Sequence, residues 1–392
     1  MNDAVALVFG TRPEAIKLAP VYQELKRRGT PVQVIVTAQH RGLLDQMLAV
    51  FGMTPDVDLD IMQEGQSLGE VTCRALAGLQ QTLHRLRPRV VLVQGDTTTV
   101  LGGALAAFYE RIPVGHVEAG LRTNDKFSPY PEEINRRLTD VLSDVYFAAT
   151  RRARRNLLGE GVAPAGIYVT GNSVVDALRF VVDQNPPLPE SLHWLDEMDG
   201  RLLLTTAHRR ENLGVPFSRI CEALRELTER YPDLTVLWPL HPNPLVTKSA
   251  HELLDGVERV VLCEPLDYLS FVPVLARADL VLTDSGGVQE EAPALGVPVL
   301  VARDTTERPE GVEAGVARLV GTETETIVLE ASRLLDSPAE YRQMAETGCP
   351  YGDGQAAPRI CDALEHFLGD RAERPADFDW VSGADTGGPG AA

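Results

Sequence analysis

Residues 5–20, VALVFGTRPEAIKLAP, decide how the rest of the sequence is interpreted. The apolar run VALVF predicts a buried strand, and the residues after the turn predict a helix. In many α/β proteins this turn is rich in glycine and binds the pyrophosphate of a dinucleotide. Here one glycine is followed by Thr11, Arg12, Pro13, Glu14 and, one turn on, Lys17. Because no GxGxxG follows a strand, the turn predicts a site for a charged ligand rather than a tightly held NAD.

The same strand-turn-helix pattern recurs along the chain. In the N-terminal half it includes VQVIVTA at 32–38, RVVLVQGD at 89–96 and PVGHVEAG at 113–120. A second series begins near residue 201 and includes RLLLTTAHRREN at 201–212 and DLVLTDSGG at 279–287. The strands are short, β-branched and apolar on both faces, as in parallel sheets covered by helices. Repeated units of this kind predict an α/β protein with doubly wound, Rossmann-like domains.

Length and composition support two such domains. The chain has 392 residues, of which 44% are hydrophobic, and single cores rarely grow beyond about 250–300 residues. We expect one domain over residues 1–171 and a second over 172–357, with the proline-rich, polar stretch at 183–200 as a linker zone. The polar segment 370–392, rich in Gly, Ala and Asp, predicts a disordered tail.

Charge and cysteine content argue against several classes of protein. The net charge is 37 − 56 = −19, which does not favour a partner such as nucleic acid or a membrane surface. No apolar run approaches the ~18 residues of a membrane span. Five cysteines without a CxxC pair, and a strand at the very start with no leader before it, predict reduced thiols in a cytoplasmic protein. HExxH, cysteine clusters and EF-hand spacing are missing, so no metal is expected.

Polar residues follow the predicted strands at the edge where open parallel sheets bind ligands. They are Arg12, Gln39, His40, Asp96, His116, Glu118, His208, Arg209, His241, Asp284, Ser285 and the stretch from Asp304 to Arg308. If the two domains face each other, these edges border one cleft. That cleft would contain several carboxylates, two or three histidines and several arginines.

Most of these residues also have a structural interpretation. Asp96 would serve equally as a helix N-cap, and Glu132, after a proline, as an acidic residue at a helix N-terminus. Lys17 could pair with Glu14 or lie in solvent. A lone histidine is more often structural, although His208 stands next to two arginines in a polar turn. The residues alone leave these alternatives open.

The stretch TDSGGVQEEA is the strongest local signal for phosphate binding. Ser285, Gly286 and Gly287 lie where a strand passes into a helix, and two glycines allow close approach to free N–H groups. The alternative is a serine N-cap with glycines in its turn. It is not a Walker loop, because no GK[ST] follows.

Ten stretches, in order along the chain, resemble one family: the non-hydrolysing UDP-N-acetylglucosamine 2-epimerases of bacteria. They are GTRPEAIKLAP, TAQHRGLLDQML, VLVQGDTTT, GHVEAGLRT, SPYPEEINRR, TGNSVVDAL, TAHRREN, DYLSFVPVL, TDSGGVQEEAPALGVPVLVARDTTERPEG and PYGDGQA. The resemblance implies a fold like that of GT-B glycosyltransferases with the active site in the interdomain cleft. It further implies a homodimer, no redox cofactor, and a last helix, about 358–369, that packs back on the first domain.

The resemblance also implies the site residues. The candidates for catalysis are Asp96, Glu118, Glu132 and His208. Those expected to bind UDP or the sugar are Arg12, Lys17, Arg209, Ser285, Gly286, Gly287, Glu291 and Arg308, with Phe271 against the uracil. Residues in stretches associated with a second, activating UDP-sugar are Gln39, His40, Arg41, Gln66 and Glu132. Gly42 and Gly65 stand where some relatives carry bulkier polar residues, which argues against such activation here.

The family interconverts UDP-N-acetylglucosamine (UDP-GlcNAc) and UDP-N-acetylmannosamine (UDP-ManNAc) by expelling UDP and forming a glycal-type intermediate. Such a route needs two proton-transfer groups on opposite faces of C2 and cations on the departing diphosphate. We expect Asp96 or Glu118 near C2 and His208 at the leaving phosphate. The competing hypotheses are a hydrolysing relative that releases ManNAc and UDP, a glycosyltransferase, and an inactive UDP-sugar sensor.

Overall fold

The computed structural model describes residues 3–37, 41–63 and 65–380. The chain forms two compact units, one built from the chain up to Ala177 together with Gly352–Asp379, and the other from Leu178–Tyr351 with Trp380. The first boundary lies inside helix α7 (Ser173–Gln184), a few residues beyond the expected division at 171. The return to the first unit begins before the expected boundary at 357. Each unit is described by itself.

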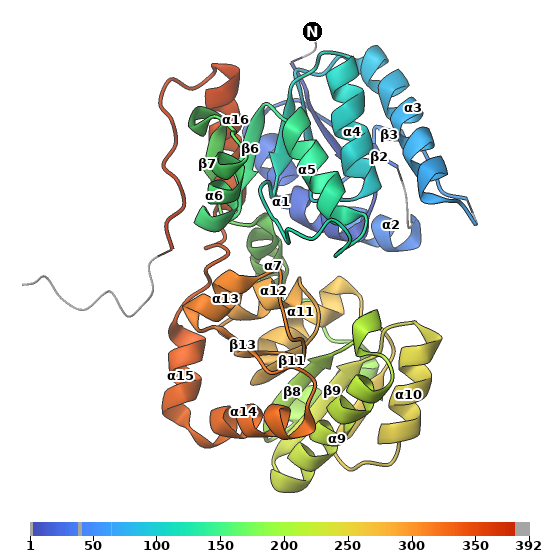
Figure 1. Ribbon diagram of the computed structural model, residues 1–392, viewed down its shortest axis with the longest axis vertical. Helices are drawn as coiled ribbons and strands as arrows, with labels where there is room; N and C mark the ends of the chain where they lie inside the picture. The colour runs from blue at the N-terminus through green and yellow to red at the C-terminus, as the bar shows by residue number, and fades with distance from the viewer. Residues whose placement is uncertain (1–2, 38–40, 64, 381–392) are drawn as a thin grey trace, which may run out of the picture. The chain divides into compact units, whose positions relative to one another are not determined.

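The first unit contains a seven-stranded parallel sheet in the order β3-β2-β1-β4-β5-β6-β7 (Figure 1). Its strands are β1 (Val5–Phe9), β2 (Val32–Val36), β3 (Val57–Asp58), β4 (Val90–Gln94), β5 (Val114–Val117), β6 (Val145–Ala148) and β7 (Ile167–Val169). Its helices are α1 (Arg12–Arg27), α2 (Arg41–Val50), α3 (Leu68–Leu86), α4 (Thr98–Tyr109), α5 (Glu132–Leu142), α6 (Arg151–Gly159), the first turns of α7, and α16 (Ala356–Leu368).

The second unit contains a six-stranded parallel sheet in the order β10-β9-β8-β11-β12-β13. Its strands are β8 (Arg201–Thr206), β9 (Leu234–Pro239), β10 (Val260–Cys263), β11 (Leu280–Thr283), β12 (Val299–Val301) and β13 (Ala317–Leu319). Its helices are α8 (Trp194–Glu197), α9 (Val215–Arg230), α10 (Pro244–Leu254), α11 (Tyr268–Arg277), α12 (Val288–Ala294), α13 (Pro309–Ala314), α14 (Thr324–Asp336) and α15 (Pro338–Glu346). Both sheets follow the Rossmann order, which confirms the predicted fold class.

Gly10, the single glycine of the first turn, is explained by packing. A Cβ at this position would lie 2.1 Å from Thr37 Oγ1 and 2.6 Å from Thr99 Oγ1. These two hydroxyl groups are fully buried and share a hydrogen bond of 2.7 Å. Only glycine therefore allows the ends of β1 and β2 to meet the start of α4. Helix α1 then begins at Arg12, with Pro13 in its first turn and Glu14 completing a capping box.

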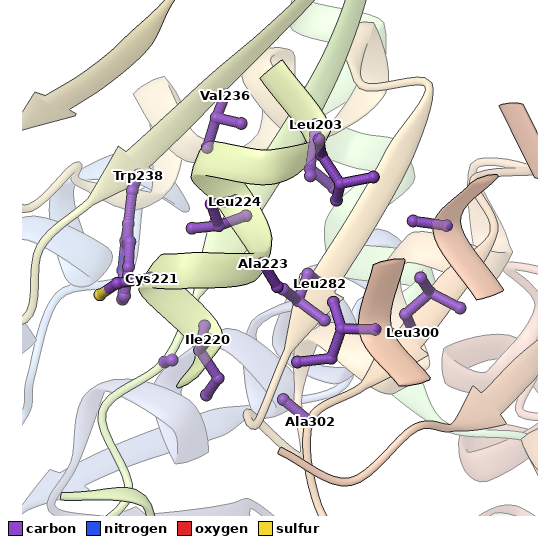
Figure 2. Packing of buried hydrophobic residues seen from close by; sticks show 14 of the residues in the cluster. Leu203, Ile220, Cys221, Ala223, Leu224, Val236, Trp238, Leu282, Leu300 and Ala302 are labelled. Carbon is purple, nitrogen blue, oxygen red and sulfur yellow. The ribbon is translucent and has the colours of Figure 1, made fainter. Parts of the chain in front are cut away.

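One hydrophobic core of the second unit lies between its sheet and helices α9, α10 and α14. Helix α9 presents Ile220, Cys221 and Leu224 at helical spacing, and Figure 2 shows these side chains among those of Leu203 and Leu282 from the sheet. All are buried. Burial of a side chain of this size contributes roughly 1.5–3 kcal/mol. The core therefore fixes the strands whose carboxyl ends carry the polar residues.

Helix α16 returns to the first unit and packs against α1. Arg28, at the end of α1, forms ion pairs of 2.7 Å with Asp362 and 2.9 Å with Glu365. Tyr168 on β7 shares a hydrogen bond of 2.8 Å with His366 on α16. These contacts link the last helix to the body of the first unit.

Residues 370–379, which composition predicts to be disordered, continue along the edge strand β7. Phe378 N donates to Val169 O at 2.7 Å, and Asp377 Oδ1 accepts from Val169 N at 2.9 Å. The Arg374 guanidinium lies 4.1 Å from the centre of the Tyr168 ring. The prediction failed because it counted these polar residues as solvated, whereas they satisfy the unpaired N–H and C=O groups of a sheet edge. Residues 381–392 lie outside the described residues.

We expect Phe378→Ala to lower the free energy of unfolding of the first unit by about 3 kcal/mol, because the ring is buried and lies under Arg359. Scanning calorimetry would measure the loss as a lower transition temperature. Glu373→Ala is the matched control, since its side chain is exposed in the same segment. Equal transition temperatures for Phe378→Ala and wild type would contradict a stabilising role for residues 370–379.

Candidate active site

Most of the predicted residues lie at the topological switch point of one of the two sheets. In the first unit this is the carboxyl edge between β1 and β4, where the turns at 10–12 and 95–97 begin. In the second unit it is the edge between β8 and β11, where the turns at 207–209 and 284–287 begin. Ligands of open α/β sheets bind at such points.

Glu118, directly after β5, is held by three donors. Lys17 Nζ lies 2.6 Å from Oε1, and Asn172 Nδ2 donates to the same oxygen at 2.9 Å. Gln94 Nε2 donates to Oε2 at 2.6 Å. The Lys17 and Glu118 side chains are only 12% and 10% exposed. This is a strong, partly desolvated ion pair.

The backbone of Glu118 is also unusual, with φ of 67°, in the left-handed region. A non-glycine residue there costs of order 1 kcal/mol. The conformation is held because Glu118 N and Ala119 N both donate to Phe147 O, at 3.0 and 3.2 Å. The pairing of Lys17 with Glu118 replaces the alternative in which it binds Glu14 or solvent.

Asp96, after β4, does not cap the following helix. The N-cap of α4 is Thr97, whose hydroxyl accepts from Val100 N. Asp96 Oδ2 instead lies 2.5 Å from Nη2 of Arg136, which is 5% exposed, while Asp96 itself is 27% exposed. Asn135 Nδ2 donates to Asp96 O at 3.0 Å. Asp96 is therefore a fixed carboxylate that solvent still reaches.

His116 links the turn that precedes Asp96 to buried residues of the same unit. The ring is fully buried, with Nδ1 2.6 Å from Asp140 Oδ1 and Nε2 2.8 Å from Gly95 O. Asp140 also accepts from Arg122 at 2.6 Å. Burial would raise the pKa of Asp140, but His116 and Arg122 hold it below its ordinary value. The network fixes the turn that precedes Asp96.

Two neighbouring glutamates at the start of α5 have different surroundings. Glu133 is fully buried and accepts from Thr123 N at 3.0 Å and Asn124 N at 3.2 Å. It therefore orders the loop after β5. Glu132 has a buried Oε2 with no hydrogen bond from any described residue. Both glutamates lie in the first turn of α5, but only Glu133 has its carboxylate occupied by hydrogen bonds to the loop.

In the second unit Asp284 connects the turns after β8 and β11. Its Oδ2 accepts from His208 N at 2.9 Å, Arg209 N at 2.8 Å and Asn212 Nδ2 at 2.9 Å. The His208 ring stacks on that of His241 with centroids 5.0 Å apart. Burial lowers the pKa of His208, and Asp284 partly opposes this.

Three arginines surround Glu307 in the same unit. Arg303 lies 2.8 Å from Glu307 and Arg209 lies 3.5 Å from it. Burial alone would raise the pKa of Glu307, but these cations and Arg308 lower it to about 2. Arg308 also forms an ion pair with Glu290. The cations predicted to bind phosphate are therefore already balanced by carboxylates.

Ser285 is not a helix cap. Its N donates to Thr283 Oγ1 at 2.9 Å, and α12 begins after Gly287. Gly286 lies beside Arg209, since a Cβ there would be 3.8 Å from its Nη2. Helix α12 has only 7 residues, so cations must supply much of any anion affinity.

The remaining predicted residues are more scattered. Glu291 is buried on α12, and Phe271 is half-buried on α11 against the core. Gln66 donates to Ile61 O at 3.1 Å. Arg41 begins α2, while Gln39 and His40 lie outside the described residues.

Within the described part of the chain, no cluster of His, Cys, Asp and Glu could hold a metal, and no helix is long and apolar enough to cross a membrane.

Comparison with known proteins agrees with this geometry. The family model described as UDP-N-acetylglucosamine 2-epimerase matches residues 23–365. The chain belongs to this family. It is 51% identical to the UDP-N-acetylglucosamine 2-epimerase of Escherichia coli K12 (92% of this chain, 98% of that one) and 49% identical to that of Bacillus subtilis 168 (95% and 98%).

Solved structures of the epimerase family agree in fold. The UDP-GlcNAc 2-epimerase of Neisseria meningitidis, bound to UDP-GlcNAc, is 46% identical with a TM-score of 0.85, over 92% of this chain and 99% of that one. A glycosyltransferase from Rickettsia africae, only 12% identical, has a TM-score of 0.62 over 94% of this chain and 100% of that one. The second likeness supports the GT-B-like fold alone.

Sequence reasoning missed several residues that bind the predicted site residues. Gln94 and Asn172 bind Glu118, and Arg136 binds Asp96, yet none was singled out. Gln94 had a local signal, because it is the one amide at the end of the apolar strand VVLVQ. Arg136 had none, since it lies 40 residues from its partner.

We expect Glu14→Gln to make stability less dependent on pH. Glu14 is fully buried, and burial raises its pKa from 4.5 to about 7. The folded state therefore binds more protons between those values, so wild-type stability falls as pH rises from about 4.5 to 7, by at most about 3 kcal/mol. The glutamine variant should lose this slope and be the more stable protein at pH 8. Calorimetric melts at pH 5 and pH 8 would show parallel curves for both proteins if the idea is wrong.

Proposed function

We propose that this isomerase interconverts UDP-GlcNAc and UDP-ManNAc by eliminating UDP and adding it back. A base removes the proton from C2, the bond between C1 and the diphosphate oxygen breaks, and UDP leaves with the electron pair. The product is a glycal with a C1–C2 double bond. C2 then receives a proton on its other face and UDP attacks C1 again. The reaction has no net oxidation or reduction, so it requires no redox cofactor.

The observation that carries the proposal is the pair of carboxylates that follow β4 and β5, at the carboxyl edge of the first unit's sheet. Asp96 is partly exposed and bonded by one cation, Arg136. Both carboxylate oxygens of Glu118 already accept from donors, including Lys17, so they are less available to a substrate proton. We therefore assign removal of the C2 proton to Asp96. Glu132, with its unbonded buried oxygen, is the candidate for transfer on the other face.

The leaving group is assigned to the second unit. Arg209 and Arg308 carry the charge that a diphosphate needs, and the Ser285–Gly287 turn lies beside Arg209. Both arginines are paired with glutamates in this structure. The diphosphate would displace these carboxylates as partners. His208 would stabilise the departing phosphate, and Arg12, at the start of α1, would add a further cation.

Deuterium labelling tests the proposed function. In heavy water the protein should convert UDP-GlcNAc into UDP-ManNAc and place deuterium at C2 of both sugars, which NMR resolves. Free ManNAc would indicate the hydrolysing alternative, and unlabelled sugar after long incubation would indicate a sensor.

Asp96→Asn should lower kcat by at least roughly 100-fold while UDP affinity, measured by calorimetry, stays near wild type. Asp199→Asn, in an exposed loop, is the control. Unchanged kcat in Asp96→Asn would remove Asp96 from the mechanism.

A homodimer in the cytoplasm completes the proposal. All five cysteines are in the described part of the chain and none forms a disulfide, which suits a reducing compartment. Helices α4 and α5 pack together and expose apolar side chains, with Val141 80% and Phe108 57% exposed. Such a surface is typical of an interface.

Val141→Asp should therefore shift the protein from dimer to monomer in light-scattering chromatography, because a charge would be buried in the interface. Leu329→Asp, at a 57% exposed position on α14, is the control and should leave the mass unchanged. If the wild-type protein elutes as a monomer, the proposed homodimer is wrong.

A further inference from the structure

The two carboxylate oxygens of Asp284 differ in their hydrogen bonding: Oδ2 accepts several hydrogen bonds and Oδ1 accepts none from any described residue. The side chain is fully buried at the end of β11. Oδ2 accepts from the backbone of His208 and Arg209 and from the amide of Asn212. Oδ1 has no hydrogen bond from any described residue, yet lies 3.4 Å from His208 Nδ1. A buried carboxylate oxygen without a donor is costly, so a hydrogen on Nδ1 is favoured.

We propose that Asp284 is a positioning residue for His208, holding its ring with a hydrogen on Nδ1 so that Nε2 is presented to the ligand. The inference rests on the function proposed above, in which His208 stabilises the leaving phosphate. Nε2 of the neutral ring is an acceptor, and Nε2–H of the protonated ring is a donor to a phosphate oxygen. In both states Nδ1 keeps its hydrogen toward Asp284.

The other groups that face the ring agree with this assignment. His241 stacks on it with an interplanar angle of 9°, so its ring edge does not compete for Nδ1. His241 Nδ1 accepts from Asn243 N at 3.1 Å. Arg209 is turned away, with Nε donating to Asp284 O at 2.9 Å. Burial, His241 and Arg209 each lower the pKa of His208, and only Asp284 raises it. The carboxylate is thus the group that makes protonation of His208 accessible when phosphate charge develops.

Asp284→Asn is the decisive variant. Three donors surround the Oδ2 position, so the asparagine oxygen must occupy it and the amide nitrogen must take the place of Oδ1. That NH₂ group donates to His208 Nδ1 and drives the hydrogen to Nε2. The turn keeps its hydrogen bonds while the tautomer reverses.

The expected result has two parts. In full-length protein labelled with ¹⁵N-histidine, wild-type His208 should carry its hydrogen on Nδ1 above its pKa, and the variant should carry it on Nε2. Comparison with a His208→Gln spectrum assigns the signals. The variant's kcat should fall by at least roughly 100-fold, with KM and UDP affinity within about threefold of wild type.

Asp279→Asn is the matched control. Asp279 accepts from Leu202 N at 2.7 Å across the same pair of strands, but at their amino ends. It should change neither the tautomer nor kcat. The proposal is overturned if wild-type His208 carries its hydrogen on Nε2, or if a folded Asp284→Asn retains wild-type kcat.

The NMR measurement and the activity measurement distinguish failure of this inference from failure of the proposed function. If wild-type protein makes no UDP-ManNAc, the proposed function fails, while the tautomer of His208 still decides the role of Asp284. If Asp284→Asn does not fold, the wild-type spectrum alone decides the question.

Discussion

Buried carboxylates that bind backbone N–H groups hold the functional loops of both units. Glu14 accepts from the turn after β1, Glu133 from the loop after β5, and Asp284 from the turn after β8. A carboxyl oxygen has two lone pairs and can accept hydrogen bonds from more than one donor at once. Loops that would otherwise be mobile thereby keep one geometry. Of the three, only Asp284 was predicted to lie at a ligand-binding sheet edge, and none was predicted to bind ligand or to act in catalysis.

Within each unit, the cations beside the candidate site residues are paired with carboxylates. The pairs are Lys17 with Glu118, Arg136 with Asp96, Arg209 with Glu307 and Arg308 with Glu290. A strongly acidic chain can therefore offer an anion site without exposing a basic face. When an anionic ligand binds one of these cations, it displaces the carboxylate partner, so the net gain in free energy is smaller than the charges alone suggest. That favours release of product as well as binding of substrate, which a reversible isomerase needs.

The sequence predicted what is local and missed what depends on distant partners. Strands such as VVLVQ, and the residues that follow them, could be placed because apolar runs and parallel-sheet geometry determine both. Local pattern gave no account of Gly10, which two threonines from other parts of the chain require. It misjudged residues 370–379, whose polar side chains bind a sheet edge. It also left the partner of Lys17 open, because Glu118 lies 101 residues away.

The two units share a topology and differ in chemistry at their switch points. In the first, the residues after β4 and β5 are carboxylates, Asp96 and Glu118, suited to proton transfer. In the second, the residues after β8 and β11 are His208, Arg209 and a glycine turn, suited to a leaving anion. The proposed elimination of UDP needs both kinds of chemistry, because a C2 proton is too weakly acidic to be removed unless the diphosphate departs. The proposal therefore assigns proton transfer to residues of the first unit and the leaving group to residues of the second.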